Sequence, residues 1–552
     1  MSGKYTADEL NKLKKSELIA MFLSQQETLN KLNANMEVLI EQLRIANTNR
    51  FGRKTERLDQ IAGQMSLFNE AEAYAEEETG EPAEAEIIIK IEKKRKKTGQ
   101  REEDFKDLPR EPHPHRLTDG QLDEFFGKGC WRRMKEDKYI RVRCQPASYT
   151  VEEHSVEVAV GTKGEHQDEF MRGDRPKDLL RNSVVTPSLM AAVMNGKYVN
   201  AIPLYRIEKE FERNGINISR QTMANWTIRC SEKYLAAVVK RLREEQLKDE
   251  VNHCDETPVQ VIYDNDPENP EDRKGAAGHK NYMWVHTTCV FNKTRPVIIY
   301  EYQRGRGHEA PLGYYRDFHG ILETDGLQQY HKLDALLPGL TNSNCWAHAR
   351  RDFSDAVKAI GKANQDAIRR SIAYQALERI RTIYQLENPL SELSAEDRLR
   401  ERQKTILPLV EEYFAWVKQC LADTEVLPKG KTAEGLNYSL NQEKYLRVFL
   451  TNGNVPLDNS FAERSLRDFC VGRKNWILIN TVRGAEASAT IYSICETAKA
   501  NNLNPYYYLE HLFEELPKLC DKDGNIDPKQ LDPLLPWAAE LPAKCHKPRR
   551  KD

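Results

Sequence analysis

The sequence predicts a multidomain α/β protein, and three observations lead to this class. The chain has 552 residues, enough for several domains with at least one full-size core. Between residues 252 and 346, short apolar runs rich in β-branched residues follow one another and then alternate with a helical pattern. Long stretches of helical periodicity precede and follow that region. We therefore expect a mixed β-sheet surrounded by helices.

Charge and cysteine content narrow the possible classes of protein. Lys and Arg number 83 and Asp and Glu 85, a formal net charge of −2, so a nucleic-acid role has to rest on local basic patches. No apolar run approaches the roughly 18 residues of a membrane span, and the N-terminus has no signal-peptide core. The 11 cysteines are scattered without a C-x-x-C pair. We expect a reduced, cytoplasmic protein with no membrane partner.

Residues 1–60 are predicted to form a coiled-coil helix. Mostly apolar residues recur every seven positions along two seams of residues 7–58, which is typical of self-associating helices. A single amphipathic helix packed on the rest of the protein is the alternative. The seams consist of Phe22, Leu29, Met36 and Leu43, and of Leu18, Gln25, Leu32, Leu39 and Ala46.

Residues 61–104 are predicted to be a linker, first acidic and then basic. Residues 69–86 carry many glutamates and no Lys or Arg, a composition typical of disorder. The run from Lys90 to Arg101 is strongly basic; such runs are usually solvated tails, and contact with a phosphate backbone is the second interpretation. Residues 105–172 are expected to form a small β module, because residues 137–160 alternate with the two-residue period of a hairpin.

Residues 173–248 are predicted to be helical, with a helix-turn-helix-like unit. Asn214 and Gly215 are typical of the end of one helix, and Ser219 is typical of the N-cap of the next. A short turn between two helices suits DNA reading, although ordinary helix packing explains the pattern about equally well. The exposed face of the second helix would present Arg220, Gln221 and Asn225.

The central α/β domain is predicted in two pieces, residues 249–353 and 454–500. The intervening residues 354–453 are almost wholly helical in pattern and are expected to be an insertion. Residues 501–552 are expected to form a C-terminal helix and a proline-rich tail. The strand candidates are residues 252–263, 282–289, 296–302, 320–324 and 342–346.

Three carboxylates stand out in the central domain. Asp255 begins an apolar strand, Asp325 follows another strand, and Glu463 lies on the polar face of a predicted helix. A carboxylate at the start of a buried strand is costly unless it is paired or binds a metal. One such acid alone would be explained as a solvated strand end. Together the three form the set that a two-metal phosphoryl-transfer site requires.

Nine motifs occur in an order that resembles a known family. They are FGRKTERL, LPRE, IPLYRIEKEFERNGINISRQTMANW, HCDETPVQV, TDGLQQY, CWAHARRDF, LDNSFAERSLRDFCVGRKNW, IYSICETAK and LLPW. Together they resemble the insertion-sequence-66 family of bacterial transposases. The resemblance implies a ribonuclease-H-like catalytic core with a DDE triad and a helical insertion before the glutamate. Carried over by motif, the triad is Asp255, Asp325 and Glu463.

The resemblance also bears on metals. Its DDE triad would hold two Mg²⁺ (or Mn²⁺) ions and needs no protein nucleophile. Glu256 should point to the opposite face of its strand, and Asp458 is the nearest alternative to Glu463. Family members usually carry a C-x-x-C-type zinc segment after LPRE. Only Cys130 and Cys144 are present here, so a structural zinc is not expected unless histidines (His113, His115, His154) replace the missing thiols.

Basic residues near the third acid are candidate DNA contacts. Two arginines beside a histidine at a helix start suit backbone contact, and a basic stretch with an aromatic ring suits stacking. A structural histidine and a fold-stabilising turn are the alternatives. The candidates are His348, Arg350, Arg351, Arg464, Arg467, Arg473, Lys474 and Trp476.

These inferences lead to a DNA transposase of a bacterial insertion sequence. It is expected to bind the terminal inverted repeats and to catalyse metal-dependent cleavage and transfer of DNA strands. The expected partners are element ends, target DNA and a second copy of the chain through the coiled coil. The resemblance alone implies companion proteins encoded by the same element. The alternatives are a metal-dependent nuclease without strand transfer and a transposase-derived DNA-binding protein without catalysis.

Overall fold

The computed structural model describes residues 177–263, 281–360, 365–422, 430–522 and 524–548. It also describes parts of 15–26 and 118–130, and residues 148–160 and 170–172. Residues 177–547 belong to one compact unit, and residues 55–176 belong to another. The described positions between 15 and 26 are helical, whereas most of the predicted coiled coil, the acidic linker and the basic run lie outside the described residues.

The predicted β module contains less regular structure than its sequence pattern suggests. A short helix, α5 (Asp119–Phe126), precedes two three-residue strands, β1 (Val158–Val160) and β2 (Phe170–Arg172), which pair antiparallel. Residues 148–157 form no strand, and Val151 is 96% exposed. The strand expected over residues 148–157 is therefore absent, and most side chains of this stretch are exposed in the part of the chain that the structure describes.

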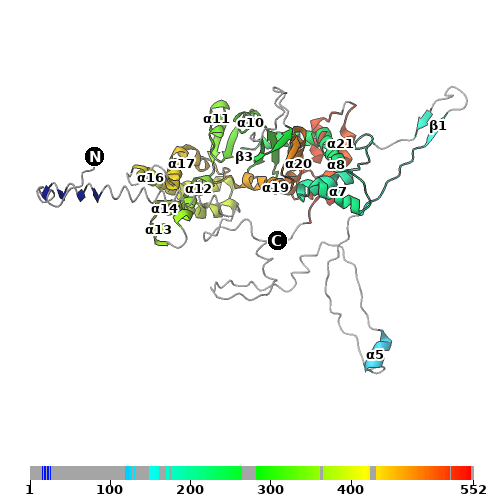
Figure 1. The fold of residues 1–552 in the computed structure, drawn as a ribbon, viewed down its shortest axis with the longest axis horizontal. Coiled ribbons are helices and arrows are strands. Elements are labelled where there is room, and N and C mark those ends of the chain that lie inside the picture. Colours follow the sequence, from blue (N-terminus) through cyan, green and yellow to red (C-terminus); the bar gives the residue numbers. More distant parts are fainter. Residues whose placement is uncertain are drawn as a thin grey trace, which may run out of the picture. The chain divides into compact units, whose positions relative to one another are not determined.

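A five-stranded mixed sheet forms the centre of the larger unit, with strand order β6–β5–β3–β7–β8 (Figure 1). The central strand pairs antiparallel on one side and parallel on the other. All five strand candidates are present, although the last lies two residues earlier than expected because Trp346 already begins a helix. The strands are β3 (Val251–Val259), β5 (Asn281–Thr288), β6 (Ile298–Gln303), β7 (Gly320–Thr324) and β8 (Leu340–Asn344).

Helix α20 (Val482–Ala500) closes one edge of this sheet. The backbone N–H groups of Ile298 and Tyr300 on edge strand β6 donate to Thr497 Oγ1 (3.0 Å) and Ser493 Oγ (2.7 Å). Unpaired edge groups would otherwise offer a template for pairing with another chain. Ser493 and Thr497 in the middle of α20 therefore satisfy backbone N–H groups of edge strand β6.

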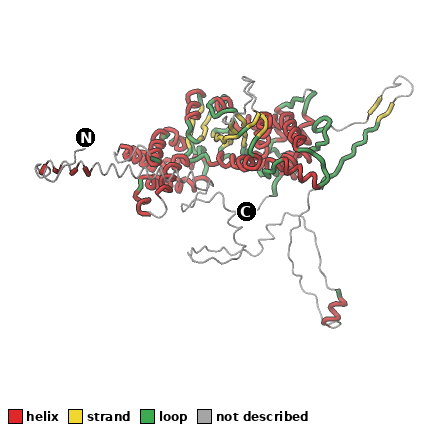
Figure 2. The backbone as a smooth tube through the Cα atoms, viewed as in Figure 1, coloured by secondary structure: helices red, strands yellow, loops and turns green. Residues whose placement is uncertain are grey.

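Helices from before and after the sheet lie around it (Figure 2). They share one hydrophobic core with it. Strand β4 (Val261–Tyr263) pairs parallel with β9 (Ile479–Thr481) beside this core. The helices before the sheet are α6 (Pro187–Met194), η1 (Asn195–Val199), α7 (Leu204–Arg213), α8 (Arg220–Cys230), η2 (Ser231–Leu235) and α9 (Ala236–Gln246). The others are α10 (Glu309–Tyr314), α11 (Gln328–Leu336), α19 (Ser460–Trp476), α21 (Pro505–Leu519), η6 (Pro528–Leu534) and η7 (Ala543–Cys545).

The turn between α7 and α8 has the predicted boundaries. Gly215 adopts φ +78°, a conformation that glycine reaches without strain. The Thr222 N–H donates to Ser219 Oγ (3.2 Å), which caps α8. The side chains of Arg220, Gln221 and Asn225 are exposed.

Residues 354–453 are helical in nearly all described positions (Figure 1). They form most of a second hydrophobic core, which Val251 of β3 and Cys289 also join. Helix α12 crosses the predicted boundary between residues 353 and 354. It begins two residues after the end of β8 and continues into the insertion. The helices are α12 (Trp346–Ile360), α13 (Gln365–Arg370), α14 (Ile372–Glu387), η3 (Asn388–Glu392), α15 (Ala395–Glu401), η4 (Arg402–Ile406), α16 (Leu407–Ala422), α17 (Lys431–Asn441), α18 (Glu443–Leu446) and η5 (Val448–Leu450).

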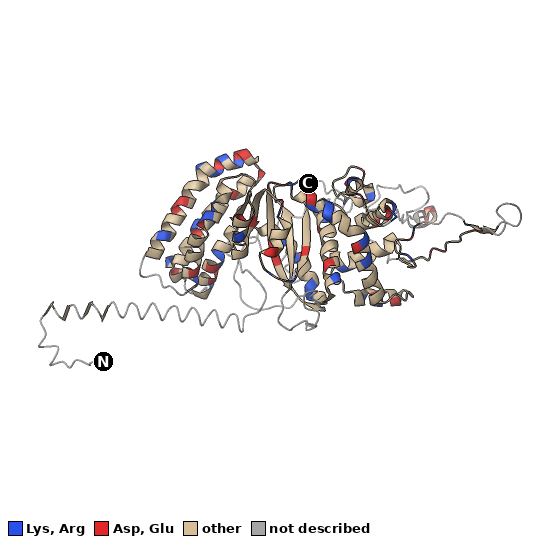
Figure 3. Cartoon of the chain, turned by 90° about the horizontal axis from the view of Figure 1, so that it is seen from above, with Lys and Arg blue, Asp and Glu red and all other residues tan. Residues whose placement is uncertain are grey.

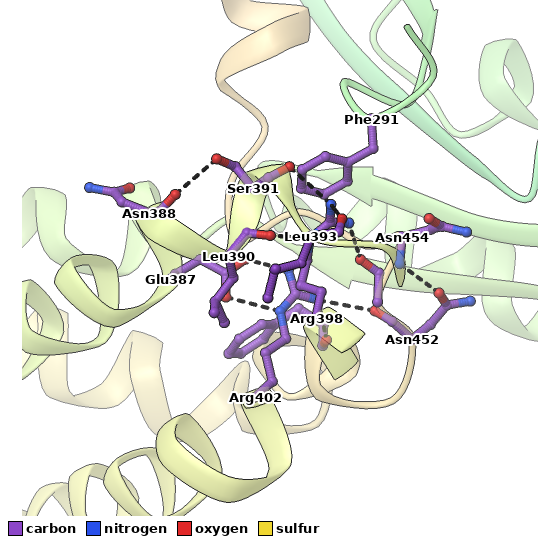
Figure 4. Close-up of polar contacts among 12 residues, drawn as sticks. Phe291, Glu387, Asn388, Leu390, Ser391, Leu393, Arg398, Arg402, Asn452 and Asn454 are labelled. Carbon is purple, nitrogen blue, oxygen red and sulfur yellow. Dashed lines mark hydrogen bonds and ion pairs between the residues drawn. The ribbon is translucent and has the colours of Figure 1, made fainter. Parts of the chain in front are cut away.

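Two buried arginines fasten the end of the insertion (Figure 4). Arg402 pairs with Glu387 and donates to the carbonyl of Phe449 (2.8 Å). Arg398 donates to the carbonyl of Gly453 (2.7 Å) and to carbonyls of the η3 segment. Asn454 then donates to Glu250, the residue before β3 (2.9 Å). The return of the chain to the sheet is thus held by charge-assisted bonds on both sides.

Surface charge and hydropathy agree with the composition. Figure 3 shows Lys and Arg interspersed with Asp and Glu over the helices. In the part of the chain that the structure describes, no helix combines the length and the apolar character needed to cross a bilayer.

Candidate active site

The three predicted acids come from two neighbouring strands at the centre of the sheet and from a helix packed on the sheet. Asp255 is on β3, Asp325 directly follows the parallel neighbour β7, and Glu463 is in the first turn of α19, which packs on β3. The pKa of Asp255 is raised well above its usual range by burial, then by the charges of Glu256, Asp325 and Glu463. The structure therefore brings Asp325 and Glu463 within electrostatic reach of Asp255.

The turn after β7 fixes Asp325. Asp325 Oδ1 accepts the Leu327 N–H (3.1 Å), and the Tyr438 hydroxyl of α17 donates to the Asp325 carbonyl (3.0 Å). Gly326 has φ +84°, and a Cβ there would lie 2.5 Å from the Tyr438 hydroxyl oxygen. Burial, followed by the charge of Glu256, raises the pKa of Asp325 to about 6.

Asn459 positions the helix that carries Glu463. Its fully buried side chain donates to the Cys254 carbonyl (2.9 Å) and lies 2.8 Å from His253 Nδ1. Its backbone N–H donates to Cys345 Sγ (3.2 Å). The start of α19 is therefore bound to both β3 and the end of β8. The sequence analysis missed Asn459, although it lies within the LDNSFAER motif.

Asp458, the alternative to Glu463, has a local role at the start of α19. Its Oδ1 accepts the Ser460 N–H (3.0 Å) and the Ser460 hydroxyl. Such an Asx turn orients a helix start. Glu463 lies one turn further along the helix, with its side chain 39% exposed.

Glu256 and Arg306 form a charged pair that the sequence analysis did not identify. Glu256 lies on the opposite face of β3 from Asp255, as expected, where it contacts Tyr330 of α11. Arg306 donates to Glu256, whose side chain is fully buried, and its Nη2 lies 4.0 Å from Asp325 Oδ2. The Arg306 side chain is 43% exposed. A sequence signal exists, because Arg306 stands between Gly305 and Gly307 in a short loop.

The start of α12 lies beside the acids. His348 Nδ1 is 3.8 Å from Glu463 Oε1. Burial, followed by the charge of Arg351, lowers the pKa of His348 to about 4, so this imidazole is neutral at pH 7. Arg351 is exposed, and its positive charge opposes part of the rise in the Asp325 pKa. The Arg350 guanidinium lies 6.0 Å from the Tyr384 ring centroid.

The remaining candidates on α19 differ in exposure. Arg464 and Lys474 are exposed and Arg467 is half-buried. Arg473 donates to Thr257 Oγ1 (3.0 Å) and to the Pro258 carbonyl, which binds the end of α19 to β3. Trp476 packs edge-on against Phe469 at 5.6 Å between ring centroids. Arg473 and Trp476 are therefore engaged within the fold.

Comparison with known sequences gives the class and then the family. A model described as "Transposase IS66 family" matches residues 182–487, more than half of the chain. The "IS66 C-terminal element" matches residues 493–537, and "Transposase C of IS166 homeodomain" matches residues 38–112, which lie outside the described residues. The protein is thus a transposase by sequence class. The chain belongs to the IS66 family of transposases.

Curated relatives come from Sinorhizobium fredii (strain NBRC 101917 / NGR234). "Uncharacterized protein y4qI" is 27% identical over 383 residues, which cover 67% of this chain and 66% of that protein. "Uncharacterized protein y4jD" is 26% identical over 373 residues, covering 66% and 68%. "Uncharacterized protein y4hP" is 27% identical over 363 residues, covering 64% and 62%. The matched stretch thus spans about two thirds of each relative.

Proposed function

We propose that the protein is a DDE-type transposase with a ribonuclease-H-like catalytic domain. The sheet supports this fold, since three antiparallel strands in hairpin order are followed by two parallel strands added on the far side of the first. The observation that carries the proposed activity is the convergence of Asp255, Asp325 and Glu463 from two strands and a helix. The helical insertion then separates the second acid from the third.

Divalent ions fit this set of side chains. Asp255, Asp325 and Glu463 form an oxygen-rich anionic site, in which burial and then the charges of Glu256, Asp325 and Glu463 raise the pKa of Asp255. Such a site suits Mg²⁺ or Mn²⁺. Asp255, Asp325 and Glu463 would hold two such ions. When bound, the ions activate the attacking hydroxyl and stabilise the leaving oxygen.

The chain's own residues orient the groups around the site. Asn459 fixes the direction of α19 and hence of Glu463, and the Asp325 turn is held by Tyr438. Arg306 donates through Nε to Glu256, and its Nη2 lies 4.0 Å from Asp325 Oδ2. We infer that its guanidinium binds a phosphate beside the scissile bond. Arg351, exposed near Asp325, would contact the next phosphate.

DNA recognition is proposed to use several parts of the chain. Helix α8 presents exposed polar side chains behind a capped turn, which suits reading of terminal inverted repeats. The homeodomain-like region and the basic run from Lys90 to Arg101 would add further contacts.

Self-association through the N-terminal heptads would place two chains on paired element ends. Light scattering of the DNA-free protein tests this self-association.

The triad is tested by size-conserving substitutions. Asp255→Asn, Asp325→Asn and Glu463→Gln should each abolish Mg²⁺-dependent cleavage and strand transfer, and their effects should be non-additive because the three groups act as one site. Terminal-repeat binding should survive, which a gel-shift titration checks. The assay uses a labelled terminal-repeat duplex and a supercoiled target, and scores nicks and joined products separately.

Asp468→Asn is the matched control, since Asp468 is a carboxylate on the same helix that pairs with Lys499 instead. It should keep activity. Nicks without joined products would favour a nuclease, and binding without chemistry in Mg²⁺ or Mn²⁺ would favour a non-catalytic DNA-binding protein. Full activity in Glu463→Gln would overturn the assignment of the third acid.

A further inference from the structure

A second donor set overlaps the proposed active site. Cys345, His348 and Glu463 each present one ligand atom, and these atoms lie within 4.8 Å of one another. Cys345 directly follows β8, and His348 lies three residues later in the first turn of α12, so one helical turn brings both toward Glu463 on α19. We propose that these three side chains form a binding site for a zinc-like divalent ion.

The ligand types distinguish this site from the carboxylate triad. Thiolate and imidazole suit Zn²⁺ or Co²⁺, whereas Mg²⁺ prefers oxygen ligands alone. Zinc–ligand bonds are roughly 2.0–2.3 Å long, so the three atoms, which lie within 4.8 Å of one another, would move closer together on binding. Three protein ligands leave a fourth position for water.

Two further observations point to a ligand at this place. His348 Nδ1 is buried and has no hydrogen-bond partner among the described residues, although it lies 3.8 Å from Glu463 Oε1. A buried ring nitrogen without a partner is costly, and a metal bond would satisfy it. The Asn459 N–H donates to Cys345 Sγ (3.2 Å), the kind of bond that supports a ligating thiolate from behind.

The proposed site has a regulatory consequence, which rests on the proposed function. Glu463 cannot serve the carboxylate triad fully while it ligates a zinc-like ion together with Cys345 and His348. Occupation of the mixed site should therefore compete with Mg²⁺ and inhibit strand cleavage. Cleavage would then depend on the ratio of the two metals.

Cobalt is the probe, because a thiolate–Co²⁺ bond gives a near-ultraviolet charge-transfer absorption that needs no DNA and no catalysis. Tag-free, metal-free full-length protein is titrated with Co²⁺, and the band should appear and then vanish as Zn²⁺ is added. Cys345→Ser is nearly isosteric. It should lower the intensity of the charge-transfer band by the amount that one thiolate–Co²⁺ bond contributes. His348→Gln should weaken Co²⁺ binding by at least roughly 10-fold.

Cys495→Ser is the matched control, because Cys495 is an equally buried thiol on α20. It should keep the full band, and circular dichroism confirms that each variant is folded. An unchanged band in folded Cys345→Ser overturns the site. If excess Mg²⁺ leaves the Co²⁺ affinity unchanged, the two metal sites do not share Glu463. That result would overturn the proposed competition between Mg²⁺ and the zinc-like ion. A Cys345-dependent band in a protein that shows no Mg²⁺-dependent cleavage would contradict the proposed function alone.

Discussion

At the scale of single residues, the site combines groups whose charge has different purposes. Glu256 is fully buried and bound to Tyr330 and Arg306, so its charge is balanced within the fold. Asp255 and Asp325, in contrast, have pKa values that burial and then the charge of Glu256 raise. A carboxylate that already has an arginine partner holds side chains in place, whereas repelling carboxylates attract cations.

Arg306 should matter for chemistry more than for metal binding. Arg306→Ala should lower the cleavage rate by roughly 10²-fold, the size of effect seen when one charge-stabilising donor is removed. Glu256→Gln should lower it less, because the neutral amide orients the guanidinium more weakly. Single-turnover cleavage of a terminal-repeat duplex measures both. Arg304→Ala, two residues earlier in the same loop, is the control and should stay near wild type; equal losses in both arginine variants would contradict the assignment.

Glu323 should make stability depend on pH. Burial raises the pKa of this β7 carboxyl to about 8 from an ordinary value of 4.5. The folded state therefore holds the proton more tightly than the unfolded state, so stability is lost as pH rises from about 4.5 through 8. Glu323→Gln should be more stable than wild type at pH 9 by more than about 1 kcal/mol, with a smaller difference at pH 6. Urea unfolding at the two pH values checks it, and a difference independent of pH would refute it.

At the scale of elements, the insertion is fastened by a buried ion pair. Arg402 is fully buried and pairs with Glu387 while binding two carbonyls of the segment that returns to β3 (Figure 4). Replacing one member leaves the other as a buried charge without its partner. This loss is much larger than the net contribution of the pair itself.

Arg402→Met should destabilise the protein by about 3–5 kcal/mol, because Glu387 stays buried without a cation. The double variant Arg402→Met/Glu387→Met should recover much of that loss, although the carbonyls of Phe449 and Asn452 remain unsatisfied. Denaturant unfolding of both variants gives the coupling energy. Strictly additive losses would show that the two side chains do not act as a pair.

Elements were more predictable from the sequence than the contacts between them. Strand patterns, the Ser219 cap and the Gly215 turn depend on neighbouring residues, so local periodicity was sufficient. The grouping of Asp255 with Asp325 came from the three carboxylates and the family motifs rather than from strand patterns. Arg306 and Glu256 lie 50 positions apart, and Asn459 and His253 lie 206 apart, so no local pattern could pair them. The strand predicted over residues 148–157 is absent for a related reason, since alternation predicts a strand only where a layer covers it.

At the scale of the whole molecule, DNA affinity should divide into a sequence-specific and a general part. Replacing Arg220 and Gln221 by alanine should weaken terminal-repeat binding more than binding to random duplex, because base contacts carry the specificity. Neutralising Lys93–Lys97 should weaken both equally and flatten the salt dependence. Fluorescence anisotropy at several salt concentrations separates the two terms. Equal losses on both duplexes for the α8 variant would exclude α8 as the reader.

The long insertion also sets an order in time. Glu463 follows Asp325 by 138 positions, and α19 reaches β3 only after the fastened end of the insertion. At roughly 5–20 residues per second, a ribosome needs about 7–28 s to make that stretch. During this interval the nascent chain carries both aspartates without their glutamate. If the three acids act together as proposed, a chain that stops within the insertion lacks the third acid and should be inert. Cleavage should then begin only after α19 has been made.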